Sequence, residues 1–381
     1  METIKWAVNH MPKTEDANLP VMALSEVEKA RTFHESFPQY SVTPLVKLNH
    51  MAEKLGLGSL YIKDESYRFG LNAFKVLGGS FAMARYIAQQ TGKDVSELPY
   101  QVLTSEALKK EFGQATFFTA TDGNHGRGVA WAANKLGQKA VVLMPKGSTQ
   151  TRLNNIRKEG ATATIEECNY DECVRMAADM AARTEHGIIV QDTAWDGYEE
   201  IPAWIMQGYG TMVMEADAQL AGAVQGYFAN RYPKTPPKVV VVEAESAACL
   251  YKGAVAGDGT IRIVDGDMPT IMAGLACGEP NTISWDILKN HVDTFVAAPD
   301  WVAAKGMRML AAPIKGDTPV TSGESGAAPF GTLACIMCMD EYQELREHLG
   351  LDETSRVLLF STEGDTDPTR YESIVWDGNE R

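Results

Sequence analysis

The feature that most constrains the fold is a regular alternation of short apolar segments and longer amphipathic segments between residues 115 and 192. The apolar segments are rich in β-branched and aromatic residues, which is typical of strands, and the segments between them are long enough for helices. The expected strands are 115–120, 139–145, 161–167 and 187–193, and the expected helices are 127–137, 148–160 and 170–186. Strands that are joined through helices form parallel sheets. This region is therefore predicted to be an α/β unit.

A second α/β unit is expected from the rest of the chain. Segments 238–245 and 356–363 are apolar runs typical of buried parallel strands, and segment 299–312 between them has a helical pattern. Segments 43–48 and 61–66 are expected to join this second unit. A chain of 381 residues with 45% hydrophobic residues can support one large or two medium-sized domains.

The charge pattern limits the classes of molecule that the protein is expected to bind. The formal net charge is −15, and acidic and basic residues are interspersed, which argues against binding to nucleic acid or to an anionic membrane surface. No segment approaches the roughly 18 apolar residues that a membrane span needs, and the first twenty residues lack the apolar core of a signal peptide. We therefore expect a small-molecule substrate and a cytoplasmic location.

The six cysteines are scattered through the chain, so reduced thiols are expected and no disulfide framework is implied. Cys335 and Cys338 form a CxxC pair inside the apolar segment 331–339, but no second pair or nearby histidine completes a metal site. We expect a buried helix there, and no metal site is predicted.

Three segments carry residue types suited to a charged cofactor and substrate. Lys75 lies in an apolar, glycine-containing segment, and such surroundings lower the pKa of a lysine and make it a nucleophile. Residues 121–126 lie between a predicted strand and a predicted helix, where free amides and the helix dipole suit a carboxylate. Ser361 follows an apolar strand, at the edge where open α/β sheets bind ligands. Taken singly, these are also compatible with a surface lysine, a turn capped by Asp122 or Asn124, and a polar loop.

Taken together, the segments resemble the fold-type II enzymes that depend on pyridoxal phosphate (PLP), the tryptophan-synthase-β type. The motifs are TPL at 43–45, FKxxGG at 74–79, GNHG at 123–126 and SxxGDxD at 361–367. Longer segments resemble the diaminopropionate ammonia-lyases within that family: KDESYRFGLNAFK, TDGNHGRGVAWAA, QDTAWDGY, IPAWIMQGY, TIMAGLACGEPN, SGESGA and STEGDTD. Chance agreement does not account for segments of this length.

This resemblance implies an architecture as well as an activity. It implies two α/β domains with mostly parallel open sheets and an active site in the cleft between them. The smaller domain would comprise residues 89–200, and the larger, discontinuous domain would comprise residues 1–88 and 201–381. Lys75, Asn124 and Ser361 would converge on that cleft. The family is usually homodimeric, so a homodimer is expected.

The resemblance also implies which residues hold the cofactor. Lys75 would form the Schiff base with PLP, and Asn124 would hydrogen-bond its phenolic oxygen. Ser361, with Thr362 beside it, would face the pyridine nitrogen. A neutral hydroxyl leaves that nitrogen unprotonated, which makes PLP a milder electron sink and favours β-elimination.

On the substrate side, the resemblance implies that Thr121, Gly123 and His125 hold the substrate carboxylate. Asp122 is the informative departure, because related dehydratases have an uncharged residue in its place. Its carboxylate would serve as a base at Cα or as a partner for a second amino group. Asp192 would be a second carboxylate near the pocket, although its position also suits a structural turn.

One expected feature is missing from the sequence. The family carries a strand and a glycine-rich loop whose amides hold the cofactor phosphate, but here the helical segment ending at Gln219 runs directly into Leu220. About twenty residues are absent by ordinary element lengths. Leu220, Ala221 and Gly222 are what remains of the loop's C-terminal flank, so Gly222 is the residue left for phosphate binding.

Our leading hypothesis is a PLP-dependent ammonia-lyase that converts D- or L-2,3-diaminopropionate to pyruvate and two ammonia. A serine or threonine dehydratase shares the fold and the elimination chemistry, although Asp122 argues against it. A non-catalytic relative is the third possibility, because the phosphate loop is absent. Under the leading hypothesis Lys75, Asp122 and Asp192 are the catalytic residues, with Lys75 removing the proton from the L isomer and Asp122 from the D isomer.

Overall fold

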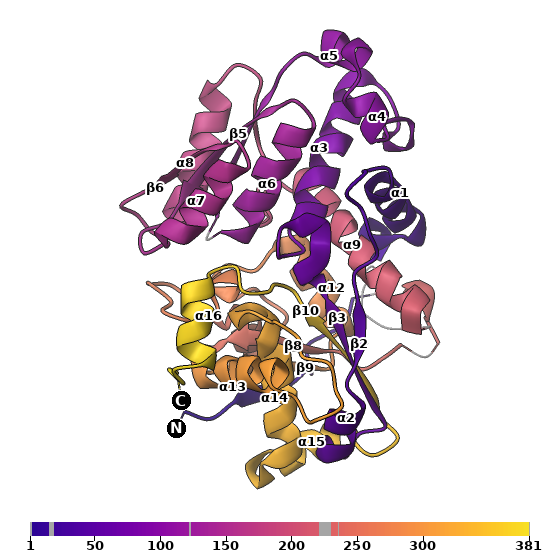
Figure 1. Cartoon of the computed structure of the whole chain (residues 1–381), viewed down its shortest axis with the longest axis vertical. Helices are drawn as coiled ribbons and strands as arrows, with labels where there is room; N and C mark the ends of the chain where they lie inside the picture. Colours follow the sequence, from indigo (N-terminus) through magenta and orange to yellow (C-terminus); the bar gives the residue numbers. More distant parts are fainter. Residues whose placement is uncertain (1, 15–18, 122, 221–229, 235, 381) are drawn as a thin grey trace.

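The computed structural model describes residues 2–14, 19–121, 123–220, 230–234 and 236–380. Figure 1 shows two parts stacked along the long axis. The upper part contains the middle of the chain, and the lower part contains both chain ends. None of the helices in the described ranges is long and apolar enough to cross a membrane.

The upper part is built on a four-stranded parallel sheet with the strand order β6-β5-β4-β7. Its strands are β4 (Thr116–Ala120), β5 (Lys139–Met144), β6 (Thr162–Ile165) and β7 (Gly187–Ile189). The intervening helices are α6 (Asn124–Lys135), α7 (Gln150–Lys158) and α8 (Tyr170–Arg183). These assignments confirm the predicted strand–helix alternation and the parallel sheet. Helix α6 begins three residues earlier than predicted, directly after the Gly123 turn.

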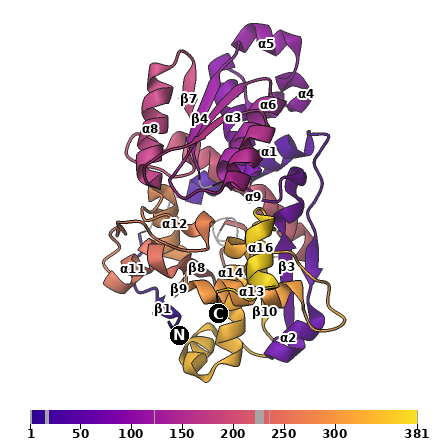
Figure 2. The same cartoon turned by 60° about the vertical axis from the view of Figure 1, so that its left-hand side comes forward.

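Alternate residues of the strands pack against helices on opposite faces of this sheet. Phe117 and Val142 belong to the same hydrophobic cluster as residues of α6, whereas Ala120 and Leu143 cluster with Ala177 of α8. Figure 2 shows α8 and α6 on either side of the strands. Successive side chains of a strand point to opposite faces, so helices cover the sheet on both sides.

Within the described ranges, the lower part contains two three-stranded sheets. The first joins β1 (Lys5–Val8), β9 (Thr294–Ala298) and β8 (Val240–Ala244), with β8 and β9 parallel and β1 antiparallel to β9. The second joins β10 (Arg356–Ser361), β3 (Ser59–Asp64) and β2 (Leu45–Lys47), with β10 and β3 parallel and β2 antiparallel to β3. This pairing confirms that segments 43–48 and 61–66 join the second α/β unit.

The two sheets of the lower part are not joined by a strand in the described ranges. Strands β8 and β10 both contact helix α14 (Glu324–Cys338), and residues of both belong to one hydrophobic cluster. Helix α9 (Glu200–Leu220) runs without a break through the Gln219–Leu220 junction. No described residue between α9 and β8 forms a strand. Residues 221–229 lie outside the described residues, so the absence of one strand from the larger sheet stays a prediction.

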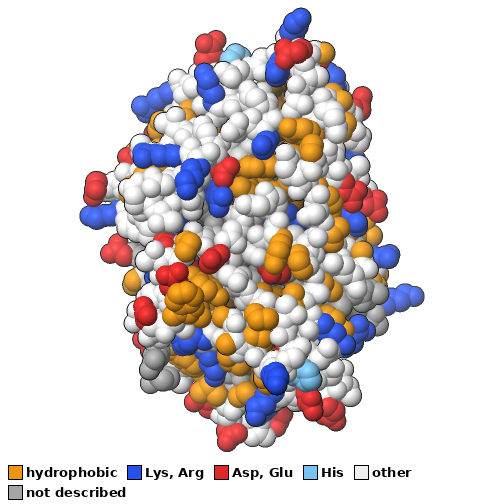
Figure 3. All heavy atoms as spheres, in the orientation of Figure 1, with side chains coloured by type: hydrophobic (Ala, Val, Ile, Leu, Met, Phe, Trp, Pro, Cys, Tyr) orange, Lys and Arg blue, Asp and Glu red, His pale blue; other side chains and the backbone are white. Residues whose placement is uncertain are grey.

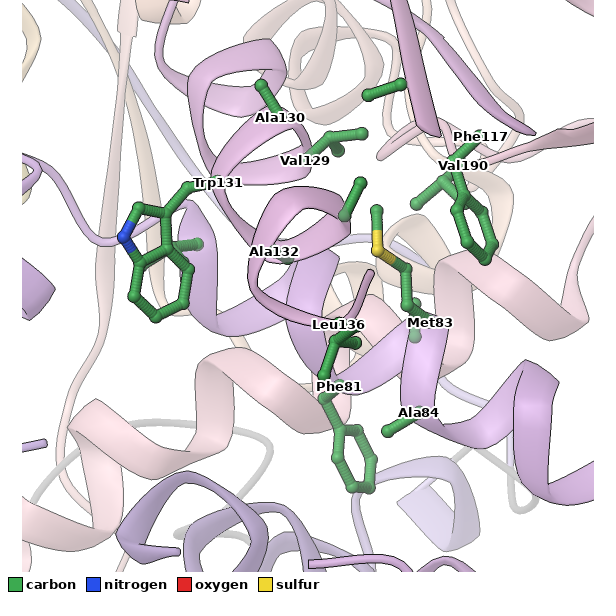
Figure 4. Close-up of a cluster of buried hydrophobic side chains, with 14 of the residues drawn as sticks. Phe81, Met83, Ala84, Phe117, Val129, Ala130, Trp131, Ala132, Leu136 and Val190 are labelled. Carbon is green, nitrogen blue, oxygen red and sulfur yellow. The ribbon is translucent and has the colours of Figure 1, made fainter. Parts of the chain in front are cut away.

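Helix α3 (Val76–Thr91) links the two parts, because it packs against both α6 and α9. Figure 4 shows Phe81, Met83 and Ala84 of α3 in one apolar cluster with Phe117, Val190 and residues of α6. Since α3 spans the proposed boundary at 88/89 and shares this core, the domain boundaries stay a prediction. The remaining helices of the described ranges are α1 (Leu24–Glu35), α2 (Asn49–Leu55), α4 (Tyr100–Leu103), α5 (Glu106–Phe112), α11 (Cys249–Ala256), α12 (Thr282–His291), α13 (Asp300–Ala311), α15 (Gln343–Leu349) and α16 (Pro368–Val375).

Two predictions for the lower part concern helices. Segment 299–312 forms α13, as expected. The CxxC pair lies at the end of α14, so the predicted helix is confirmed, and Cys335 is fully buried. Cys338 is exposed, which corrects the expectation that both thiols are buried, because the helix ends at this residue and its last turn reaches the surface.

Candidate active site

Lys75 occupies the N-cap position of α3, where two tertiary contacts hold the backbone. The amide of Phe74 donates a hydrogen bond to the carbonyl of Thr362 (3.2 Å), which ties the segment to the end of β10. Gly128 of α6 lies against the same turn, and a Cβ atom there would be 2.7 Å from the backbone nitrogen of Val76. The close packing of α6 and α3 therefore requires glycine at this position. Both contacts fix the backbone position from which the Lys75 side chain extends.

The Lys75 ammonium is paired with a carboxylate from the upper part. Its Nζ atom lies 2.5 Å from Oδ2 of Asp192, a residue that follows β7. Burial alone would raise the pKa of the Asp192 carboxyl, but His125, which is protonated in the acid range where this carboxyl titrates, and Lys75 outweigh burial and lower the pKa below its usual range. Asp192 is therefore charged at neutral pH. A charge-assisted hydrogen bond of this kind is stronger than one between neutral groups.

Aromatic rings complete the surroundings of Lys75. Its Nζ atom lies 5.6 Å from the ring centroid of Phe74 and 5.8 Å from that of Tyr209, which are cation–π distances. Burial raises the pKa of the Tyr209 hydroxyl above its usual range, so the phenol is neutral. The Asp192 carboxylate and the two aromatic rings around Lys75 therefore favour a positively charged group.

Lys75 and Asp192 open onto a cavity of about 780 Å³ between the upper and lower parts. Two more predicted residues, Thr121 and His125, line the same cavity. Its other charged lining residues are Lys146, Arg152, Glu167, Asp171, Glu172, Asp267, Glu279 and Arg370. Figure 3 shows Lys and Arg side chains just above the level where the two parts meet and Asp and Glu side chains at and just below it, while both kinds also occur elsewhere on this face. A zwitterionic ligand would find a side chain of opposite charge in this lining for each of its two charged groups.

The residues predicted to contact the cofactor ring lie beside this cavity rather than in its described lining. Asn124 and Gly123 line a small adjacent pocket with Thr366. The Asn124 amide donates a hydrogen bond to Glu363 (2.5 Å). Ser361 is buried, and its hydroxyl donates to the hydroxyl of Ser322 (2.8 Å).

These residues are nevertheless connected to Lys75 through the end of β10. Glu363, which binds Asn124, pairs with Ala73 in an isolated bridge, and the carbonyl of Thr362 accepts from Phe74. Lys75, Asn124, Ser361 and Thr362 therefore come together around one strand end. Asp122 and Gly222 lie outside the described residues.

Sequence reasoning assigned no role to Glu363 and Glu324, which form a buried carboxylate pair near this strand end. Glu363 Oε1 accepts from the amide of Ser325 (3.0 Å), and Arg370 lies 3.4 Å from Glu324. Burial, and then repulsion from Glu363, raise the pKa of Glu324 to about 7. Both residues stand in motifs that carried the resemblance, SGESGA and STEGDTD, but no local pattern shows that the two motifs meet.

A second cluster that sequence reasoning did not identify anchors α9 to β3. Glu215 of α9 binds Lys63 and Arg68 at 2.8 Å each, and Arg68 also binds Glu65. All four side chains are almost completely buried. The two positive and two negative charges balance, as buried charges require. This cluster positions α9, which carries Tyr209, beneath Lys75.

Comparison with known proteins gives the class to which this fold and site belong. The profile of the pyridoxal-phosphate dependent enzymes matches residues 37–359. The chain belongs to this family.

Within the family, the chain is similar to diaminopropionate ammonia-lyases. The enzyme of Salmonella typhimurium is 52% identical over an alignment that covers 91% of each chain. The crystal structure of selenomethionine-containing holo diaminopropionate ammonia-lyase from Escherichia coli matches with a TM-score of 0.91 and 41% identity, covering 99% of this chain and 98% of that chain. The same Escherichia coli enzyme in complex with D-serine matches with a TM-score of 0.90 and 40% identity over the same shares of the two chains.

The described residues fit pyridoxal phosphate on the side of its reactive carbonyl. A lysine stands in a cavity whose volume lies within the range of about 300–1,000 Å³ usual for small-molecule sites. His125 lines that cavity, and its buried Nδ1 atom has no hydrogen-bond partner among the described residues. This atom is therefore available to a bound ligand. The phosphate donors expected near Gly222 lie outside the described residues.

Proposed function

We propose that this chain catalyses the α,β-elimination of 2,3-diaminopropionate, in its D and L forms, to pyruvate and two ammonia. The observation that carries the proposal is the Lys75–Asp192 pair in the cavity, in a chain 52% identical to a diaminopropionate ammonia-lyase. The reaction consumes one water, whose oxygen becomes the keto oxygen of pyruvate, and both nitrogens of the substrate leave as ammonia.

Some residues of the chain would bind the cofactor, and others would act on the substrate. When bound, PLP supplies an electron sink that lowers the barrier to removing the Cα proton. Lys75 would hold the cofactor through Nζ and accept the Cα proton of the L isomer, and Asp192 would orient Nζ and stabilise its charge. Asn124, Ser361, Thr362 and Gly222 would bind the cofactor.

The remaining predicted residues would act on the substrate. Thr121, Gly123 and His125, beside the N-terminus of α6, would bind the carboxylate, because that helix end carries partial positive charge. The amides of Thr121 and Gly123 already donate to the Leu143 carbonyl and to the Thr121 hydroxyl, so the His125 amide and the helix end would supply most of the attraction. Asp122 would accept the Cα proton of the D isomer. Closure of the two parts around the cavity would exclude water from the reacting atoms.

The test is a coupled assay on the purified holoenzyme. Pyruvate is followed by NADH oxidation with lactate dehydrogenase, and ammonia is counted separately. We expect two ammonia per pyruvate from either isomer. A protein that carries stoichiometric PLP and makes no pyruvate from either isomer would refute the proposal.

A serine or threonine dehydratase remains the second candidate, since a related enzyme has been crystallised with D-serine. The hydroxyl of serine carries no charge, whereas diaminopropionate offers a cation to Asp192. We therefore expect kcat/KM to be higher for diaminopropionate than for serine or threonine. A preference for either hydroxy amino acid would reverse the assignment.

A non-catalytic relative is the third candidate, and it is favoured by the unbroken course of α9 through Gln219 and Leu220. Titration of the folded apoprotein with PLP, followed by absorbance and by mass of the borohydride-reduced protein, measures occupancy. One PLP per chain attached at Lys75 supports the enzyme. Substoichiometric binding in a folded sample supports the non-catalytic alternative.

We further propose, from the resemblance, that the enzyme is a cytoplasmic homodimer. Sedimentation velocity of the holoenzyme and fractionation of the producing cells test the two statements separately. A monomer at micromolar concentration would contradict the first statement, and recovery with membranes would contradict the second.

A further inference from the structure

The hydrogen bonds of His125 determine where its proton lies. Its Nε2 atom is 2.9 Å from the backbone carbonyl oxygen of Val190. A carbonyl oxygen only accepts hydrogen bonds, so Nε2 must carry the proton. Burial lowers the pKa of His125, which keeps the ring neutral at physiological pH. The Nδ1 atom is therefore a bare acceptor.

This acceptor is buried and faces another acceptor. The His125 side chain is 3% exposed, and Nδ1 has no hydrogen-bond partner among the described residues. It lies 3.6 Å from Oδ2 of Asp192, and both residues line the cavity. Two acceptors at this separation cannot bond each other, but they can share a group that offers several donors. A buried polar atom left unpaired costs free energy until such a group arrives.

The chemistry of that group is indicated by what already lies beside Asp192. The Lys75 ammonium binds Oδ2 of Asp192 and stands over the rings of Phe74 and Tyr209. A carboxylate, an aromatic cation–π surface and a free imidazole lone pair are all ligands for an ammonium ion. The substrate carboxylate does not fit, because it would meet Asp192 and a lone pair.

We propose that His125 and Asp192 form an ammonium subsite that binds the second amino group of the substrate and selects diamino acids. The proposal rests on the proposed function and names the residues that set its specificity. The subsite keeps the β-nitrogen as –NH3⁺. When the Cα electron pair forms the C=C bond, the C–N bond breaks and its electron pair leaves with neutral NH3, so no further proton is required.

The proposal revises one role given to His125. Its side chain has no free N–H for the substrate carboxylate, so only its backbone amide can serve that group. The described titratable groups that interact with His125 or Asp192 at the subsite are Lys75, Tyr198, Tyr209 and Cys277. Burial raises the pKa of the Tyr198 hydroxyl above its usual range, so it is neutral. Burial raises the pKa of the Tyr209 hydroxyl above its usual range and that of the Cys277 thiol to about 11, so neither adds charge at neutral pH.

Two substitutions separate the two ring nitrogens. In His125→Gln the side-chain amide can still donate to the Val190 carbonyl, but no acceptor remains at the Nδ1 position. In His125→Asn an acceptor remains near the Nδ1 position, but the side chain is too short to reach Val190. A purely structural histidine would tolerate Gln better than Asn, and an ammonium acceptor would show the opposite order.

We expect His125→Gln to raise KM for diaminopropionate, relative to KM for serine, by about 10- to 100-fold, the worth of a hydrogen bond to a charged group. In His125→Asn this ratio should stay close to that of the wild type, even if the protein is less stable. Equal changes in both KM values for His125→Gln, or a larger change in the ratio for His125→Asn, would overturn the proposal.

A second readout does not depend on turnover. The holoenzyme labelled with ¹⁵N-histidine is titrated with ammonium chloride, and sodium chloride at the same ionic strength is the control. The Nδ1 resonance that disappears in His125→Gln should shift with ammonium and not with sodium. If the wild type makes no pyruvate, the proposed function fails, while this titration still tests the subsite. Absence of an ammonium-specific shift would remove the subsite whatever the enzyme catalyses.

Discussion

The Nζ atom of Lys75 lies 2.5 Å from Oδ2 of Asp192, although 117 residues separate the two in the sequence. The lysine stands at the start of α3 and the carboxylate follows β7, so the contact joins two elements that only the folded chain brings together. A buried carboxylate at this distance aims the lysine nitrogen into the cavity. This site and the two clusters that support it lead to four testable predictions.

The first prediction concerns Asp192. Asp192→Asn keeps the shape of the side chain but removes the charge that orients Lys75. We expect kcat/KM for both isomers of diaminopropionate to fall by roughly 10²-fold, because losing one partner of a buried charge pair costs about 2–5 kcal/mol. The matched control is Asp171→Asn, which neutralises another carboxylate in the cavity lining. Similar losses in the two variants would show that Asp192 contributes only to the general charge of the cavity.

The second prediction is stereochemical and rests on the sequence, since Asp122 lies outside the described residues. A base on one face of the planar substrate–cofactor system cannot reach a proton on the other face, so two isomers require two bases. Asp122→Asn should reduce turnover of the D isomer by about 10²–10⁴, the usual contribution of a positioned general base. The L isomer should lose much less. Pyruvate formation from each pure isomer measures both, and equal losses would make Asp122 a binding residue.

The third prediction is a pH dependence of stability that arises from Glu324. Its folded-state pKa of about 7 lies above the ordinary value of 4.5, mainly because the group is buried. Between these values the folded chain keeps a proton that the unfolded chain has lost, so this group stabilises the fold at low pH. The stabilisation is lost as pH rises through about 7.

The measurement is urea unfolding of the wild type and of Glu324→Gln from pH 4.5 to 8. The free energy of unfolding of the wild type, relative to the variant, should fall by about 2–3 kcal/mol over this interval. Glu344→Gln, an exposed position on α15, is the control and should show no such trend. A difference that is constant or rises with pH would contradict the shifted pKa.

The fourth prediction concerns the buried cluster around Glu215. Glu215→Gln leaves Lys63 and Arg68 with Glu65 as their remaining carboxylate, and should lower the free energy of unfolding by about 3–5 kcal/mol. The double variant Lys63→Met/Glu215→Gln restores charge balance and should be more stable than Glu215→Gln alone. Additive losses in the double variant would mean that the charges do not act as a unit.

Local sequence patterns determined the secondary structure and the class of fold. The strand–helix alternation of residues 115–192 predicted β4 to β7. Such patterns are local, because each depends only on neighbouring residues and on which face of the strand or helix is buried. The resemblance carried by the motifs around Lys75, His125 and Ser361 likewise indicated a PLP enzyme, since a motif is a string of neighbours. The sequence also predicted that one strand of the larger sheet is missing, and in the described residues the lower part contains two separate three-stranded sheets.

The tertiary structure decided which distant groups meet. No local pattern indicates that Asn124 binds Glu363, that Glu324 and Glu363 share a buried corner, or that Glu215 neutralises Lys63 and Arg68. The sequence does not indicate the tautomer of His125 either, because the tautomer depends on the carbonyl of Val190, 65 residues away. Charges and hydrogen bonds act over a few ångströms in space, and their sign and strength depend on burial, which the packing of α6, α9 and β10 around Lys75 creates. The sequence therefore determined which chemical groups the site has, and the fold determined which of them are paired and which are left to bind a ligand.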